Sequence, residues 1–133
     1  MDQDALRDWS KRAADWAHEY HRTLRDRPVR AQTSPGAFAA ALPDAPPETA
    51  EDMTAIWDDF TRLVPEAMTH WQHPRFFAYF PANAAPASML AHQLAGAIAT
   101  QAMLWQTAPA ATGLGQERVR WHGKARGLPG GCS

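Results

Sequence analysis

Apolar residues recur at spacings of three and four along residues 4–24, which predicts an amphipathic helix. The opposite face of this helix is charged, and Asp2 and Asp4 suit its positive N-terminal end. A helix with large aromatic side chains along one face must pack that face against another element or another chain. The apolar positions are Leu6, Trp9, Ala13, Trp16 and Tyr20.

A second helix is predicted after a connector that is rich in proline. Residues 27–35 should be extended, residues 36–42 a short helical turn, and residues 43–47 a stiff linker. Thr49 is the predicted N-cap, with Asp52 three residues on as in a capping box. The helix should end near Pro65, which cannot continue it. Its apolar face consists of Met53, Ile56, Trp57, Phe60, Leu63 and Val64.

A third helix is predicted from Pro86 or Ser88 to Leu104, in a segment that is almost free of charge. Its many small and polar residues favour a buried helix over a membrane span. From Gly113 onward, glycines and charges interrupt any helical periodicity, so this tail is predicted to be poorly ordered. The apolar positions of the third helix are Met89, Leu90, Leu94, Ile98 and Met103.

An aromatic strip, residues 69–81 with the sequence THWQHPRFFAYFP, separates the second helix from the third. Pro74 and Pro81 each disfavour helical geometry in the preceding residue, which predicts an extended backbone between them. Both faces of such an extended segment would be apolar. We therefore expect the strip to be buried on both sides, between two layers of the protein.

Composition excludes several classes of function. A chain of 133 residues with a net charge of −1 and a pI of about 6.6 offers no electrostatic footprint for nucleic acid or an anionic membrane. Its single cysteine, Cys132, fits a reducing compartment, and the acidic N-terminus lacks the apolar core of a secretory signal. A cytoplasmic location is the expectation.

The residues alone provide no complete catalytic constellation. His70 and His73 have the spacing of a helical metal pair, but Pro74 interrupts the helix and no third ligand lies nearby, so no metal site is predicted. Lys11 and Lys124 lie in charged, solvated surroundings that do not suit Schiff-base chemistry. By itself, this pattern indicates a helical, aromatic-rich interaction segment.

The string His70-Trp71, followed by residues 73–81 with the sequence HPRFFAYFP, strongly resembles the N-terminal part of the aromatic-L-amino-acid decarboxylases. These are group II decarboxylases that depend on pyridoxal 5'-phosphate (PLP). The likeness extends to about Thr112. It implies a mainly α fold, in which residues 1–85 are a helical N-terminal dimerisation arm. Residues 86–133 would then open a truncated PLP-dependent transferase-like α/β large domain with its first helix.

The resemblance also implies a function and a site. The function is that of a carboxy-lyase acting on aromatic L-amino acids as a homodimer, with aromatic walls that hold the substrate ring. The cofactor lysine and the other PLP-binding groups of such enzymes lie beyond the matched region. No catalytic residue is therefore expected in this chain, nor PLP binding by this chain alone. The implied substrate-binding residues are Trp71, Tyr79, Phe80, Pro81, Ala82 and Met103.

Two classes of function stay open on the sequence. The chain is either a piece of a PLP-dependent amino-acid decarboxylase or a non-catalytic helical interaction module. As a piece of a decarboxylase, it would be part of a longer protein or be completed by another polypeptide. The second class includes a decayed gene fragment that associates with a full-length relative. Replacement of the family's acidic-Leu-acidic pattern by Gly113-Leu114-Gly115 favours a tail that has drifted.

Overall fold

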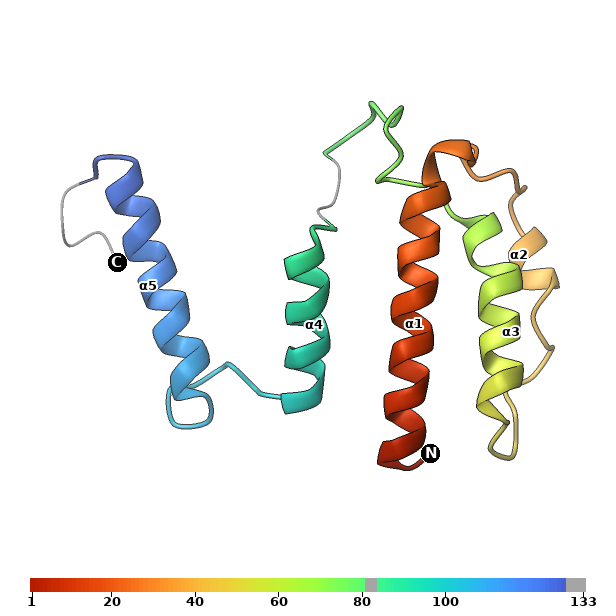
Figure 1. The fold of residues 1–133 in the computed structure, drawn as a ribbon, viewed down its shortest axis with the longest axis horizontal. Coiled ribbons are helices and arrows are strands. Elements are labelled where there is room, and N and C mark those ends of the chain that lie inside the picture. The colour runs from red at the N-terminus through yellow and green to blue at the C-terminus, as the bar shows by residue number, and fades with distance from the viewer. Residues whose placement is uncertain (81–83, 129–133) are drawn as a thin grey trace. The chain divides into compact units, whose positions relative to one another are not determined.

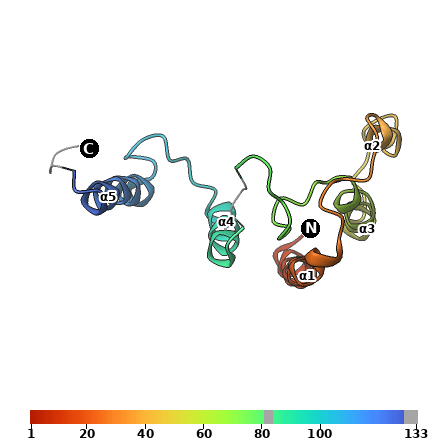
Figure 2. The same ribbon diagram turned by 90° about the horizontal axis from the view of Figure 1, so that it is seen from above.

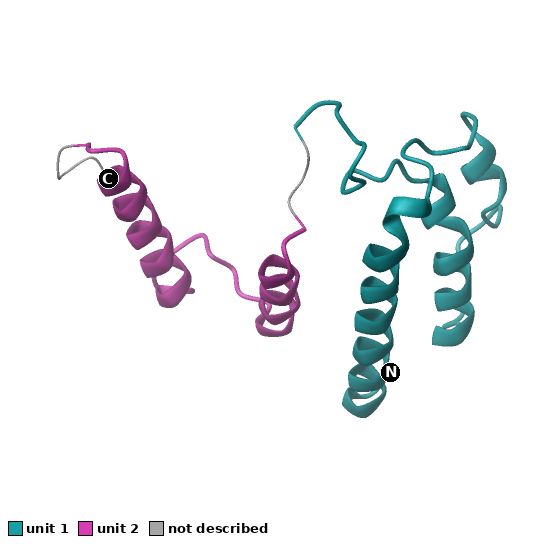
Figure 3. Ribbon diagram, turned by 45° about the horizontal axis from the view of Figure 1, so that its top comes forward, with its two compact units in different colours: residues 1–83 teal, residues 84–133 magenta. Residues whose placement is uncertain are grey.

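In the computed structural model, which describes residues 1–80 and 84–128, every regular element of these residues is a helix. The predicted mainly α fold class is therefore confirmed. The chain divides into two compact units, residues 1–83 and residues 84–133 (Figure 3). The α-helices are α1 (Gln3–Thr23), α2 (Ala37–Ala40) and α3 (Met53–Leu63) in the first unit, and α4 (Pro86–Ile98) and α5 (Pro109–Ala125) in the second.

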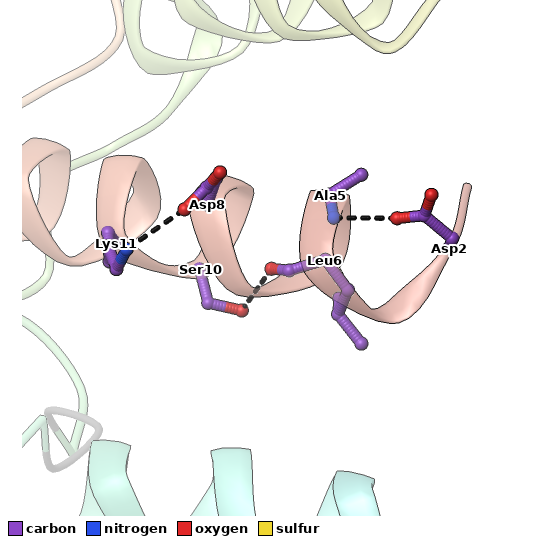
Figure 4. A network of polar contacts seen from close by, with 6 residues as sticks. All are labelled: Asp2, Ala5, Leu6, Asp8, Ser10 and Lys11. Atoms are coloured by element: carbon purple, nitrogen blue, oxygen red, sulfur yellow. Dashed lines mark hydrogen bonds and ion pairs between the residues drawn. The ribbon is translucent and has the colours of Figure 1, made fainter.

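Helix α1 begins and ends close to its predicted bounds. The Asp2 carboxylate caps it by accepting a 2.8 Å hydrogen bond from the backbone N–H of Ala5 (Figure 4). One turn on, Lys11 pairs with Asp8 at 2.9 Å on the charged face. A short 3₁₀ turn (Leu24–Asp26) follows the helix and buries Leu24.

Helix α3 begins later than the capping box predicts. Its N-cap is Asp52, whose carboxylate accepts a 2.7 Å hydrogen bond from the backbone N–H of Thr54. The prediction of Thr49 as the cap was therefore wrong. Asp52 is an equally good capping residue, and its negative charge also suits the positive helix end. The predicted end of the helix is confirmed, because Pro65 opens a separate 3₁₀ turn (Pro65–Ala67).

Helices α1 and α3 lie side by side and run in the same direction, and residues 24–52 connect the end of α1 to the start of α3 (Figures 1 and 2). Their predicted apolar faces meet through aromatic rings. Trp9 packs on Trp57 with ring centroids 5.6 Å apart, and Trp16 meets Phe60 edge-on at 5.2 Å. The Arg12 guanidinium lies 4.9 Å from the Trp9 ring and 5.1 Å from the Trp57 ring. This aromatic seam joins the two helices.

Helix α4 is shorter than predicted and is not buried. It ends at Ile98, because Ala99 adopts a left-handed conformation (φ 51°) that closes the helix through its N–H to the Ala95 carbonyl oxygen. The predicted extension to Leu104 was wrong. None of the residues of α4 is buried in this chain, so the prediction of a buried helix is also corrected.

Residues 109–125 form helix α5, although the glycines of this segment predicted a poorly ordered tail from Gly113 onward. Pro109 occupies its first turn, where a missing N–H costs nothing, and Gly127 (φ 67°) follows its end. The N–H of Gly127 bonds to the Lys124 carbonyl and that of Leu128 to the Gly123 carbonyl, at 3.1 and 3.0 Å. These two bonds form a Schellman motif. The glycine after the helix is thus a stop signal, and the glycines within the helix do not disrupt it.

No helix within residues 1–80 or 84–128 combines the length and apolar character needed to cross a membrane.

Candidate functional site

The aromatic strip forms consecutive turns instead of an extended strand. The N–H of His73 bonds to the His70 carbonyl at 3.0 Å, and the N–H of Phe76 bonds to the His73 carbonyl at 2.9 Å. Each bond joins residues three apart, as in a β-turn, and the second turn has Pro74 in its favoured position. The turns reverse the chain, so its side chains do not alternate across a sheet.

The strip is also exposed, contrary to the prediction that both of its faces are buried. The exposed fractions of Phe77, Tyr79 and Phe80 are 91%, 84% and 95%. The apolar faces of α1 and α3 pack on each other, so they are not available to cover these rings. Exposed aromatic side chains in such number indicate a binding surface.

Trp71 organises an aromatic cluster that we define as Trp71, Phe76 and Tyr79. Its ring lies 5.0 Å from Phe76 and 5.8 Å from Tyr79, and it is nearly parallel to the Tyr79 ring, with an interplanar angle of 22°. Trp71 keeps 38% of its surface exposed. The cluster therefore presents flat aromatic area to solvent, as a site for another aromatic ring does.

Tyr79 reaches this position through a strained backbone. Its φ of 55° lies in the left-handed region, which costs a non-glycine residue about 1–2 kcal/mol. Stacking on Trp71 offsets a cost of this size, since aromatic pairs contribute about 0.5–1.5 kcal/mol beyond area burial. A strained and exposed aromatic residue is typical of a functional position.

Two buried histidines in the same turn as Trp71 are held by hydrogen bonds to other parts of the first unit. His70 and His73 are 4% and 3% exposed. His70 Nδ1 shares a 2.8 Å hydrogen bond with the Tyr20 hydroxyl, and His73 Nε2 lies 3.2 Å from the Arg25 carbonyl oxygen. These contacts engage the rings with protein groups. No group of three His, Cys, Asp or Glu residues suited to a metal ion occurs within residues 1–80 and 84–128.

Arg27 sets the electrostatics around this pair of histidines. Its guanidinium lies 5.4 Å from the centre of the Tyr20 ring and pairs with Glu66 at 3.6 Å. Burial lowers the pKa of His70, and the Arg27 charge lowers it further. Burial likewise raises the pKa of Tyr20. Near neutral pH the hydrogen bond between Tyr20 and His70 therefore joins two uncharged side chains.

The structure brings together only some of the site residues that the resemblance predicts. Trp71 and Tyr79 are brought into contact, Phe80 is exposed, and Pro81 and Ala82 lie outside the described residues. Met103 lies in the second unit, in the turn between α4 and α5, and is 79% exposed.

Phe76 is a member of the cluster that the sequence analysis missed. The signal was present, because a proline at Pro74 predicts a turn that brings Phe76 back towards Trp71.

Neither lysine of the chain fits a cofactor that is held covalently in a desolvated pocket. Lys11 is exposed and pairs with Asp8, and Lys124 is exposed in the last turn of α5. A lysine that forms a Schiff base needs a lowered pKa, from an apolar environment or a neighbouring cation. Residues 1–80 and 84–128 therefore offer no lysine suited to PLP.

Comparison with known proteins places the helices and the aromatic cluster in a family. Residues 35–132 match the pyridoxal-dependent decarboxylase conserved domain. The chain is 40% identical over 130 residues to an aromatic-L-amino-acid decarboxylase of Manduca sexta. It is 35% identical over 129 residues to a phenylacetaldehyde synthase of Arabidopsis thaliana. The chain belongs to the pyridoxal-dependent decarboxylase family, and the resemblance inferred from the aromatic strip is confirmed.

Solved structures support the same assignment. The chain matches the crystal structure of Rhodiola rosea 4-hydroxyphenylacetaldehyde synthase with a TM-score of 0.88 and 36% identity, covering 97% of this chain and 28% of that one. It matches Oryza sativa TDC with PLP and tryptamine with a TM-score of 0.90 and 28% identity, covering 97% and 27%. The chain spans about a quarter of the length of the curated relatives and corresponds to the N-terminal part of these enzymes.

Proposed function

We propose that this chain is the N-terminal segment of a PLP-dependent enzyme that acts on an aromatic L-amino acid. In this proposal, residues 1–85 form the dimerisation arm and residues 86–133 open the large domain. The exposed stack of Trp71 and Tyr79 carries the proposal, since it offers a flat apolar wall to a substrate ring. Phe80, Pro81, Ala82 and Met103 complete the proposed substrate-binding set.

The names of the relatives support an aromatic substrate class. They include decarboxylases of aromatic L-amino acids, tryptophan and tyrosine, together with synthases of phenylacetaldehyde and 4-hydroxyphenylacetaldehyde. An aromatic ring is common to all of these names, whereas the reaction differs. We therefore assign recognition of the aromatic ring to this segment. For the reaction we propose decarboxylation, because the family model and several of the relatives are named for it. The single cysteine supports a cytoplasmic location.

The cofactor and this segment would have different roles in such an enzyme. PLP, when bound, supplies an electron sink for the negative charge that develops at the substrate α-carbon. The residues of the aromatic cluster contribute binding and orientation, because the cluster consists of three rings that can hold another aromatic ring by stacking. Held by its ring, the substrate would present its amino-acid end to groups outside this segment.

A chimera tests the proposed function directly. Residues 1–112 of this chain would replace the matching segment of the Manduca sexta relative, which keeps that enzyme's own cofactor-binding part. We expect a folded, PLP-loaded protein that releases carbon dioxide from an aromatic L-amino acid. The parent enzyme is the control. A chimera that folds and binds PLP but does not discriminate aromatic from aliphatic amino acids would contradict the proposal.

A second candidate function is a helical interaction module that associates with a full-length relative. Exposed apolar residues in both units favour it, since surfaces of this kind mark interfaces. The main ones are Phe77, Phe80, Leu90, Leu94, Ile98, Met103 and Trp105.

We expect the isolated chain to self-associate or to bind such a relative at micromolar concentration, because this apolar surface is left uncovered. Sedimentation velocity, alone and with the Manduca sexta enzyme, measures both events. A single monomeric species in each experiment, with cooperative unfolding, would exclude this candidate and would also weaken the assignment of residues 1–85 as a dimerisation arm.

A further inference from the structure

The hydrogen bond between Tyr20 and His70 links parts of the chain that are 50 residues apart. Tyr20 lies near the end of α1, and its ring stacks on Trp16 at 5.3 Å with an interplanar angle of 16°. Trp16 in turn contacts Phe60 of α3. The Tyr20 hydroxyl is therefore held by the aromatic seam and points to the turn that carries Trp71.

His73 fixes the other end of the same turn, and its bonds define its tautomer. Its Nδ1 accepts a 3.0 Å hydrogen bond from the backbone N–H of Arg75, so this nitrogen carries no proton. Its Nε2 faces the Arg25 carbonyl oxygen at 3.2 Å, an acceptor, and so Nε2–H is the donor. The 3₁₀ turn after α1 thereby holds the C-terminal end of the turn.

Two backbone contacts complete the attachment. The N–H of His70 donates to the Val29 carbonyl at 2.9 Å, and the N–H of Ala31 donates to Thr69 Oγ1 at 3.3 Å. The turn of residues 70–73 is thus bonded to α1, to the following 3₁₀ turn and to the connector. Trp71 belongs to this turn, and its ring contacts Phe76 and stacks on Tyr79.

We propose that Tyr20 is a positioning residue for the aromatic cluster, acting through His70. Its hydroxyl fixes the His70 ring, the ring fixes the turn of residues 70–73, and the turn sets the angle at which Trp71 meets Tyr79. Tyr20 has no place among the substrate-binding residues assigned above. The inference deepens the proposed function and rests on it for what the cluster binds.

Tyr20→Phe in the 133-residue chain separates this role from simple packing. The phenyl ring can keep its stacking on Trp16, whereas His70 Nδ1 loses its hydroxyl partner. We expect the indole N–H resonance of Trp71, assigned by its loss in Trp71→Phe, to shift or broaden together with the ring resonances of Tyr79. The resonances of Trp105 and Trp121 in the second unit should not move.

Thr61→Val is the matched control, because it also removes a hydroxyl from the first unit. Thr61 Oγ1 donates to the Trp57 carbonyl oxygen at 3.0 Å, so this hydrogen bond stays within α3 and does not involve the turn. Its removal should leave the Trp71 and Tyr79 resonances unchanged. If Tyr20→Phe left both resonances in place, or if Thr61→Val disturbed them equally, the positioning role would be overturned.

A pair of substitutions at His70 covers the case in which Tyr20→Phe does not fold. An asparagine side chain places a polar atom close to the position of Nδ1, whereas leucine places only carbon there. His70→Asn should therefore preserve the Trp71 signal better than His70→Leu. Equal signals in the two variants would contradict the proposal.

A pH titration gives an independent readout in the wild-type chain. The ionisable groups around the Tyr20–His70 contact are Arg27, Glu66, His73 and His21. Protonation of His70 would add a charge beside Arg27, and its lowered pKa places this event below the ordinary value of 6.5. The Trp71 resonance should shift in step with the titration of His70. A Trp71 resonance that does not shift over the pH range in which His70 titrates would count against coupling through His70.

The chimera provides the kinetic test. Tyr20→Phe should raise KM for the aromatic amino acid about fivefold while kcat stays within about twofold, since a misaligned ring wall weakens binding of the ring. A loss of folded enzyme would instead lower kcat per total protein without changing KM, and that result would overturn the proposal. An inactive wild-type chimera would refute only the proposed function. The positioning role of Tyr20 would still be tested, because the spectroscopic experiments do not depend on activity.

Discussion

Replacing Trp57 by alanine is expected to lower the free energy of unfolding of the first unit by about 2–3 kcal/mol. Trp57 contacts the Trp9 ring, the Phe60 ring and the Arg12 guanidinium, so one substitution removes much of the aromatic seam. The expected loss lies at or below the lower end of the range for buried Trp→Ala changes, because Trp57 is only partly buried.

Urea denaturation followed by far-UV circular dichroism measures this loss. Trp121→Ala is the matched control, since Trp121 is an exposed tryptophan of α5. We expect its effect to stay within about 0.5 kcal/mol, as for most surface substitutions. If the two variants lost similar amounts of stability, the aromatic seam would not be the main contact between α1 and α3.

Replacing Tyr79 by alanine in the chimera is expected to lower kcat/KM for an aromatic amino acid about tenfold. The ring that stacks on Trp71 is removed, and with it part of the wall proposed for the substrate. Stability should fall by only about 0.5–1.5 kcal/mol, the contribution of the lost stacking on Trp71, because the side chain is otherwise 84% exposed.

Phe77→Ala is the control for this experiment. Phe77 is as exposed as Tyr79 and lies two residues away, but it is not part of the aromatic cluster. Its removal should leave kcat/KM within about twofold. A fall in melting temperature that accounts for all the lost activity of Tyr79→Ala, with unchanged substrate affinity in the remaining folded enzyme, would refute the pocket assignment.

Local signals predicted most of the helical structure. The apolar periodicity that predicted α1 and α3 depends on residues three or four apart, and Asp2 and Pro65 act within a single turn. The same local signals also produced the errors. Thr49 and Asp52 both suit an N-cap, and the glycines of α5 concealed the helix that Pro109 begins and Gly127 ends.

The site was predicted less completely than the helices. Some of its residues lie together in one string of sequence, whereas others meet only through contacts between distant parts of the chain. Resemblance selected Trp71 and Tyr79 from a contiguous string, and the structure places their rings in contact. An extended strip does not bring Phe76 to Trp71, whereas the turn that Pro74 favours does. The roles of His70 and Tyr20 could not be predicted, since neither residue has a nearby partner in the sequence.

By itself, the sequence determined the mainly α class, the helices of the first unit and membership of the pyridoxal-dependent decarboxylase family, because periodicity and a long specific string are properties of contiguous residues. Only the tertiary structure decided that the aromatic strip is exposed and that its two histidines are buried. Burial depends on which surfaces remain after α1 and α3 have packed together. The Tyr20–His70 bond likewise exists only because that packing brings the end of α1 beside a turn 50 residues away.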